Sequence, residues 1–321
     1  MPVQLILYVF GFILIWFGAG LVVRNVEKLS HALKMSSFAI SFLVLGFFTS
    51  ISELSVGLNA VIQQDPEIYV GNLIGASIVL FMLIIPLLAI IGNKIHIQKG
   101  FTGLSLPLSL IVIGAPVIFA MDGVIERRDG VICMLLYLVL VLFVQTKQGV
   151  VEKLSQIVKM KKSILGKELF YILVGVGVIF FASTIVVDQT EYLAQLLGVS
   201  PFLISLLIVA IGTNVPEIAV AFRSIFSHNN QVAFGDYVGS ASFNTFLFGF
   251  LSFLIGTEVR LTNSYLVSLI FLLVGLMLFY IFAKTKNTIS RKEGVFILLV
   301  YLLFLLSEYY LHVNQLKIRL F

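Results

Sequence analysis

Two stretches of this sequence decide the fold because they resemble each other: Met35–Glu53, MSSFAISFLVLGFFTSISE, and Val199–Glu217, VSPFLISLLIVAIGTNVPE. Aligned without gaps, they are identical at Ser36 and Ser200, Phe38 and Phe202, Ile40 and Ile204, Ser41 and Ser205, Leu43 and Leu207, Thr49 and Thr213, and Glu53 and Glu217. The same separation of 164 residues aligns Gly71 with Gly235 and Gly75 with Gly239. Chance similarity between apolar segments matches leucines, but it does not match glycines, a threonine and a glutamate at one offset. The chain therefore contains an internal repeat.

The composition places the repeat in a membrane. Of 321 residues, 60% are hydrophobic and only 12% are charged, and the mean hydropathy is +1.09. A soluble domain carries about 25% charged residues. This excludes soluble enzymes, soluble nucleic-acid-binding proteins and disordered scaffolds, and it indicates a polytopic membrane protein. The single cysteine, Cys133, excludes an internal disulfide and any cysteine-based metal cluster.

Ten apolar stretches are long enough to span a bilayer. They cover residues 3–23, 36–62, 68–92, 103–121, 130–146, 168–187, 199–226, 231–255, 263–283 and 292–311. The longest polar stretch divides them into a first five-helix repeat (1–146), a basic cytoplasmic linker (147–167) and a second five-helix repeat (168–321). Five is an odd number, so the second half enters the membrane upside down. We predict an all-α membrane protein of ten transmembrane helices in two inverted-topology repeats.

The distribution of cations sets the orientation. With both termini outside, 16 of the 21 lysines and arginines fall on cytoplasmic segments, as the positive-inside rule requires. We therefore expect a multi-pass protein of the cell (plasma) membrane. The basic net charge of +5 then reflects membrane orientation, and we expect the lipid bilayer and no nucleic acid as a partner.

Of the 16 acidic residues, three fall well inside predicted spans: Glu53, Glu217 and Asp236. Insertion of a carboxylate at mid-bilayer costs at least about 2.5–3.5 kcal/mol, so such residues are usually retained for a function. A structural ion pair would need a buried cation, and only Arg223, near the inner end of the seventh span, is available in the same spans. We interpret the two glutamates as functional residues.

Each glutamate follows a polar interruption, Thr49-Ser50 before Glu53 and Thr213-Asn214-Val-Pro216 before Glu217. These residues favour helices weakly, and a proline removes a backbone donor. The result is a set of carboxylate, hydroxyl and loosened backbone oxygens, and Ca²⁺ takes six to eight oxygen ligands. Two glutamates would neutralise its charge. Without the ion they would repel each other and attract a proton or Na⁺, and that competition is the basis of exchange.

These residues resemble the calcium/cation antiporter superfamily, whose sodium/calcium exchangers carry two repeats of the form G-T-S-x-P-E followed by G-N-x-x-G-S-x-x-x-N/D. The second repeat fits, with Gly212-Thr213-Asn214-Val-Pro216-Glu217 and Gly239-Ser240-Ala-Ser-Phe-Asn244. The resemblance implies a secondary active antiporter that exchanges Ca²⁺ for Na⁺ by alternating access, with the first and sixth spans sliding as a gate. The cation ligands that it implies are Thr49, Ser50, Glu53, Thr213, Asn214, Glu217, Ser240 and Asn244.

The first repeat departs from that pattern: Ser52 replaces proline, Ala76 replaces serine, and Leu80 replaces an asparagine or aspartate. In the second repeat Asp236 replaces the usual asparagine, and it either adds charge to the metal site or accepts a hydrogen bond behind Glu217. These departures keep a Ca²⁺/H⁺ antiporter, or one for another cation and H⁺, as the alternative.

Other functions have weaker support. H-E-x-x-H and G-x-S-x-G motifs are absent, so we predict no enzyme activity, no catalytic residue and no cofactor apart from the transported ions. We also expect a protein that functions as a monomer, with inorganic cations and the lipid bilayer as its partners. A binding or regulatory protein that has lost transport is a third hypothesis.

Overall fold

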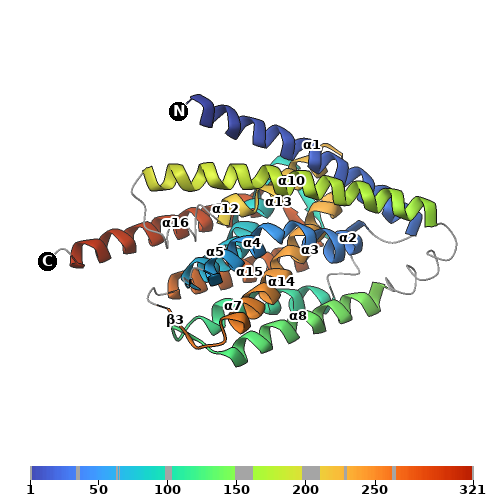
Figure 1. Cartoon of the computed structure of the whole chain (residues 1–321). Helices are drawn as coiled ribbons and strands as arrows, with labels where there is room; N and C mark the ends of the chain where they lie inside the picture. The colour runs from blue at the N-terminus through green and yellow to red at the C-terminus, as the bar shows by residue number, and fades with distance from the viewer. Residues whose placement is uncertain are drawn as a thin grey trace.

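Helices make up most of the part of the protein that the structure describes (Figure 1). The computed structural model describes residues 2–33, 37–62, 64, 66–97, 103–148, 162–196, 210–227, 230–261 and 265–319. Most of the expected linker, at 149–161, and the first part of the seventh span, at 199–209, lie outside these residues.

The first half contains five expected spans, two of them in pieces. The first span is α1 (Pro2–Leu33), and the fourth and fifth are α7 (Ser105–Phe119) and α8 (Arg127–Gln148). The second span is divided into α2 (Ser37–Ile40), η1 (Ser41–Leu45), α3 (Gly46–Thr49) and α4 (Ile51–Ile62). The third span is divided into α5 (Pro66–Val79), η2 (Leu80–Ile84) and α6 (Ile85–Ile91). The elements η1 and η2 are π-helical turns.

The second half repeats this order. Its helices are α10 (Lys162–Leu196), α12 (Ala210–Thr213), α13 (Val215–Phe226), α14 (Asn230–Ile255), α15 (Leu266–Lys286) and α16 (Arg291–Arg319). Within the described residues, six helical segments are long and apolar enough to cross a membrane: those of the first, second, third, eighth, ninth and tenth expected spans. The remaining spans fall on α7, α8, α10 and α12–α13. Both α1 and α10 continue about ten residues beyond the apolar stretch that predicted them.

The last helices of the two halves begin at equivalent residues. The first residue of α8 is Arg127 and that of α16 is Arg291, which are 164 residues apart. The third residue of each helix is an acid whose carboxylate accepts a hydrogen bond from the backbone amide that precedes the helix. The Asp129 carboxylate accepts from the Glu126 amide at 2.8 Å, and the Glu293 carboxylate accepts from the Ser290 amide at 2.7 Å.

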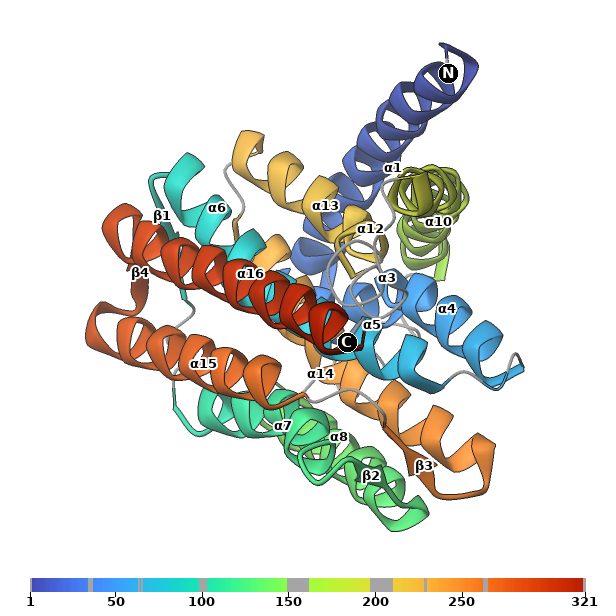
Figure 2. The same cartoon turned by 90° about the vertical axis from the view of Figure 1, so that its left-hand side faces the viewer.

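Two short antiparallel ribbons join the halves, and the sequence did not predict them. The strands β1 (Lys94–His96) and β4 (Thr288–Ser290) form one pair, and β2 (Val124–Ile125) and β3 (Val259–Arg260) form the other. The 164-residue offset converts β1 into β3 and β2 into β4. Figure 2 shows the two ribbons far apart in the molecule. The inverted repeat therefore relates the two ribbons to each other. Each ribbon pairs a loop of the first half with a loop of the second half.

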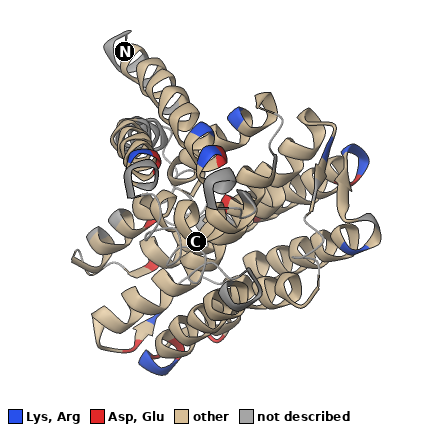
Figure 3. Cartoon of the chain, turned by 90° about the vertical axis from the view of Figure 1, so that its right-hand side faces the viewer, with Lys and Arg blue, Asp and Glu red and all other residues tan. Residues whose placement is uncertain are grey.

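The third and eighth spans form the centre of the bundle. In an 18-residue apolar stretch of the third and of the eighth span, 78% and 72% of the residues are buried, against 39% and 28% in the corresponding stretches of the ninth and tenth. Charged residues gather mainly near helix ends, whereas the lengths of the helices are largely uncharged (Figure 3). Large apolar side chains such as Leu303 on α16, 57% exposed, are suited to contact lipid.

Glycines bring α14 against the second span. A Cβ atom on Gly235 would lie 2.5 Å from the Phe38 carbonyl oxygen, and one on Gly46 would lie 2.5 Å from the Ser240 amide nitrogen. A Cβ atom on Gly239 would collide with the Phe42 carbonyl oxygen. Such small residues allow two helix backbones to touch.

The helices α1 and α10 lie side by side as a pair (Figures 1 and 2). A Cβ atom on Gly18 would lie 2.9 Å from the Gly175 carbonyl oxygen, and the reverse distance is also 2.9 Å. Lys28 and Glu168 add an ion pair at 3.9 Å. The pair contacts the other helices largely through pieces of the second and seventh spans, including α13, α12 and α4.

Candidate functional site

Both predicted helix interruptions are present, and they are equivalent. The second span breaks at Ser50 (φ −74°, ψ 7°) and the seventh at Asn214 (φ −85°, ψ 9°), positions separated by 164 residues. Pro216 lies in the first turn of α13, where a missing amide hydrogen breaks no helical bond. Two polar breaks, one from each half, thus lie at matching positions.

The breaks place each glutamate at the start of a helix. Glu53 is in the first turn of α4 and Glu217 in the first turn of α13. Both residues are fully buried, at 0% exposure. The positive end of the helix dipole favours a carboxylate in the first turn. The local fold therefore offsets part of the cost of two buried acids.

One carboxylate oxygen of each glutamate accepts from a serine. The Ser240 hydroxyl on α14 donates to Glu217 Oε1 at 2.9 Å, and it lies 2.8 Å from the Ser50 hydroxyl. The Ser52 hydroxyl donates to Glu53 Oε2 at 2.8 Å, and it lies 3.1 Å from the Thr213 carbonyl oxygen. These contacts join the second, seventh and eighth spans.

A second pair of contacts follows the repeat. Thr49 Oγ1 donates to Asp236 Oδ1 at 3.0 Å, and Thr213 Oγ1 donates to Asn72 Oδ1 at 3.3 Å. Thr49 and Thr213 are equivalent, and so are Asn72 and Asp236. Asn72 was not predicted as a ligand, although the 164-residue offset aligns it with Asp236. The two halves thus make the same contact, with a charge in only one of them.

Five buried oxygens of the predicted ligands have no hydrogen-bond partner. They are Glu53 Oε1, Asn214 Oδ1, Glu217 Oε2, Asp236 Oδ2 and Asn244 Oδ1. Their residues are at most 1% exposed, and the Glu217 carboxylate repels both Glu53 and Asp236. Buried polar atoms are nearly always satisfied. An unsatisfied set of carboxylate and amide oxygens is suited to a hard cation.

Cations of the protein do not compensate these acids in the described part of the chain, where lysines and arginines pair instead with other acids, among them Glu126, Asp129, Glu168 and Glu258. Arg223 lies over the Trp16 ring of α1, 5.7 Å from its centroid. Among the same residues, no three His, Cys, Asp or Glu side chains converge closely enough to hold a metal ion. A bound cation would therefore also need hydroxyl, amide or backbone oxygens.

The structure brings most of the predicted ligands together. Seven of them are connected across the two halves by hydrogen bonds, made directly, through Ser52, or through residues adjacent in the sequence. They are Thr49, Ser50, Glu53, Thr213, Glu217, Asp236 and Ser240. Asn214 donates its amide to the Ala210 carbonyl at 2.6 Å and keeps its own oxygen free. Asn244 lies one turn beyond Ser240 on α14, but neither of its amide atoms has a partner.

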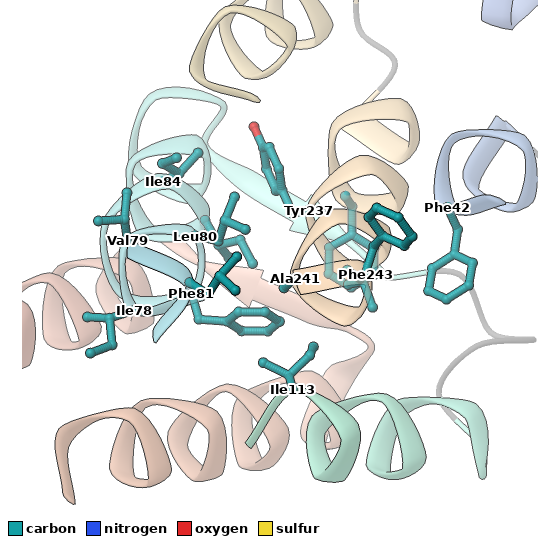
Figure 4. Packing of buried hydrophobic residues seen from close by; sticks show 14 of the residues in the cluster. Phe42, Ile78, Val79, Leu80, Phe81, Ile84, Ile113, Tyr237, Ala241 and Phe243 are labelled. Atoms are coloured by element: carbon teal, nitrogen blue, oxygen red, sulfur yellow. The ribbon is translucent and has the colours of Figure 1, made fainter. Parts of the chain in front are cut away.

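The first half contributes fewer oxygens than the second. Leu80, at the position equivalent to Asn244, is fully buried and points from η2 toward Tyr237 and Ala241 of α14 (Figure 4). Ala76, equivalent to Ser240, is also fully buried. The site is thus built unequally by two halves that otherwise match.

The helix α10 covers one side of these residues. A cavity of about 10 Å³, the size of one water molecule, is lined by Thr49, Ser52, Pro216 and Phe48 and by Val176, Ile179 and Phe180 of α10. Ser52 and Thr49 are therefore separated from α10 by little more than a water.

A further buried acid on α16 was not predicted from the sequence. Glu308 on α16 is 4% exposed and accepts from Ser268 at 2.9 Å. It lies near the end of its span, where a charged residue ordinarily marks the boundary with water. Neither Glu308 nor Ser268 has a polar equivalent in the first half, where Val144 and Leu104 stand.

Known proteins resemble the chain over most of its length. The family described as "Sodium/calcium exchanger protein" matches residues 3–146 and 167–310, two segments again 164 residues apart. The inner membrane protein YrbG of Escherichia coli is 26% identical over 249 residues, 74% of this chain and 75% of that protein. The sodium/calcium exchanger MaX1 of Methanosarcina acetivorans is 22% identical over 96% of this chain and 99% of its own length.

A solved structure has the same fold. The structure of the sodium-calcium exchanger NCX_Mj superposes with a TM-score of 0.81 and 21% identity, and the match covers 95% of this chain and 99% of that one. The ten-helix arrangement in two repeats is therefore confirmed.

Proposed function

This chain belongs to the sodium/calcium exchanger protein family, and on that basis we propose that it is a secondary active antiporter that exchanges Ca²⁺ for Na⁺ by alternating access. The observation that carries the proposal is the set of five buried oxygens, drawn from both halves, that lack a hydrogen-bond partner. The proposed metal site comprises Thr49, Ser50, Glu53, Thr213, Asn214, Glu217, Asp236, Ser240 and Asn244.

The chemistry of these oxygens supports a divalent cation. An uncompensated charge in the interior costs several kcal/mol, so Glu53 and Glu217, both fully buried, need a positive ion between them. Ca²⁺ prefers carboxylate, amide and hydroxyl oxygens in flexible geometry. Na⁺ accepts the same ligands, and its competition with Ca²⁺ for them would couple the two fluxes.

The arrangement of the helices supports alternating access. Two similar halves with opposite orientations can exchange conformations at little cost. The α1–α10 pair contacts the bundle largely through the broken helices that carry the glutamates. Movement of this pair would therefore alter access to the site.

A proton is the alternative coupling ion. Leu80 and Ala76 remove oxygens from the first half, while Asp236 adds a third carboxylate. A site with fewer ligands and more carboxylates is less suited to several Na⁺ ions and better suited to H⁺. We retain Ca²⁺/H⁺ exchange as the second candidate for this reason.

Transport by the purified protein in liposomes separates the candidates. Uptake of radioactive Ca²⁺ is measured with an imposed Na⁺ gradient at equal pH, and with an imposed pH gradient without Na⁺. We expect uptake driven by the Na⁺ gradient. Uptake driven by the pH gradient alone would favour proton coupling, and uptake under neither gradient would contradict Ca²⁺ antiport.

Matched variants test the site in the same assay. Glu53→Gln and Glu217→Gln remove one buried charge each, and we expect either to abolish Ca²⁺ uptake. Glu308→Gln is the control, because Glu308 is a buried acid bonded to Ser268 at 2.9 Å on the peripheral helix α16. Wild-type uptake by either of the first two variants would contradict the proposed site.

We also propose a monomeric protein of the plasma membrane with both termini outside. One chain supplies both halves of the site, and no resident cofactor is required besides the transported ions. The distribution of cations along the sequence supports the orientation.

A further inference from the structure

The two halves of the site use different serines. We infer that Ser52 is a positioning residue for Glu53 and replaces the hydroxyl that the first half lacks at Ala76. The inference rests on the proposed function, because it concerns how the same cation site holds its glutamates.

In the second half the serine is on the eighth span. Ser240 donates to Glu217 Oε1 at 2.9 Å, while Glu217 Oε2 has no partner. One oxygen is thus held and the other is free. The position equivalent to Ser240 in the first half is Ala76, which has no hydroxyl.

In the first half the serine comes from the broken helix itself. Ser52 donates to Glu53 Oε2 at 2.8 Å, while Glu53 Oε1 has no partner. The position equivalent to Ser52 in the second half is Pro216, which has no hydroxyl. Each glutamate therefore has one serine donor and one free oxygen, and the donor comes from a different helix in each half.

Ser52 also spans the boundary between the halves. Its hydroxyl lies 3.0 Å from the Thr49 carbonyl oxygen and 3.1 Å from the Thr213 carbonyl oxygen. A hydroxyl has one hydrogen, and a bond to a carboxylate is about twice as strong as a bond to a neutral acceptor. Ser52 therefore donates to Glu53 and fixes its rotation beside the Thr213 backbone.

The different positions of the serine donor in the two halves suggest a rescue experiment. Ser52→Ala and Ser52→Pro remove the hydroxyl, and the double variant Ser52→Pro/Ala76→Ser copies the second half into the first. Proline belongs at this position in the first turn of a helix, as Pro216 does in α13. Ser109→Ala is the control, because its buried hydroxyl donates to the Ser105 carbonyl of its own helix, α7, at 2.8 Å.

Two quantities are measured: Ca²⁺ binding to the purified protein by calorimetry, and the KM and maximal rate of Ca²⁺ uptake in liposomes. We expect Ser52→Ala and Ser52→Pro to weaken Ca²⁺ binding and raise KM about tenfold, the effect of losing one hydrogen bond to a charged group. The maximal rate should change less. The double variant should recover most of the affinity, and Ser109→Ala should match the wild type.

Unchanged affinity in Ser52→Ala, or a double variant no better than Ser52→Pro, would overturn the inference. If Ser52→Pro fails to fold, Ser52→Thr, which keeps the hydroxyl, takes the place of the double variant. Equal losses of Ca²⁺ affinity in Ser52→Thr and Ser52→Ala would then overturn the inference. Wild-type protein that neither binds nor transports Ca²⁺ would instead contradict the proposed function.

Discussion

The difference between Asn72 and Asp236 shows how two similar halves can build an unequal site. Each accepts from the threonine of the opposite half, at 3.3 Å and 3.0 Å, and both are fully buried. The amide and the carboxylate have nearly the same shape, so the packing is preserved while one negative charge is added. At this contact the difference in charge between the two halves is thus set by one residue, without a change in the surrounding framework.

Asp236→Asn tests whether that charge acts on the cation. The variant keeps an acceptor for Thr49 and removes the carboxylate, so the fold should persist. We expect Ca²⁺ affinity to fall about tenfold, as for loss of one charged contact, when binding is measured by calorimetry. Wild-type affinity would show that Asp236 lies behind Glu217 and contributes only a hydrogen bond.

The sequence predicted the residues whose chemistry stands out locally. A glutamate inside an apolar run is visible without a structure, and its duplication 164 residues later identified both members. Ser52 looked like a lost proline, because its contacts with Glu53 and Thr213 depend on the meeting of two helices. Glu308 looked like a boundary residue, because only packing against Ser268 shows that it is buried.

The helix interruptions and the close contacts between helices act together to form the site. The breaks at Ser50 and Asn214 turn the glutamates inward, and the glycines of α14 let the second span approach close enough to share hydrogen bonds with Ser240. The breaks were predictable from Thr, Ser, Asn and Pro. The π-helical turns η1 and η2 were not, because no side-chain pattern distinguishes them from an α-helix.

Gly239→Ala tests this helix contact. A Cβ atom at Gly239 collides with the Phe42 backbone, which cannot move as a flexible side chain can. We expect a loss of about 1–3 kcal/mol of stability, the usual cost of overpacking, seen as a lower melting temperature in detergent. Gly177→Ala on α10 is the control, because its Cβ atom would have no neighbour within 4 Å. Equal melting temperatures for the two variants would contradict the role of Gly239.

Across the whole molecule, the repeat relates even the loops. Gly123 and Asn287, at equivalent positions, both adopt a left-handed backbone (φ 77° and 51°) immediately before β2 and β4. The ribbons were not predictable, because strands of two or three residues from distant loops leave no local pattern. They nevertheless support the predicted topology, since each ribbon pairs two loops that it assigns to the same side of the membrane.

For the whole molecule, the remaining prediction is which side of the membrane each loop faces. Counting cations puts the loop of β3 outside and the loop of β4 inside. Single cysteines at the exposed Thr257 and Thr285 report these loops, and the native Cys133 is buried, which shields it from reagents in water. We expect a membrane-impermeant maleimide to label Thr257→Cys in intact cells and Thr285→Cys only after permeabilisation. The opposite pattern would place both termini in the cytoplasm while leaving the fold unchanged, because an inverted repeat builds the same bundle in either orientation.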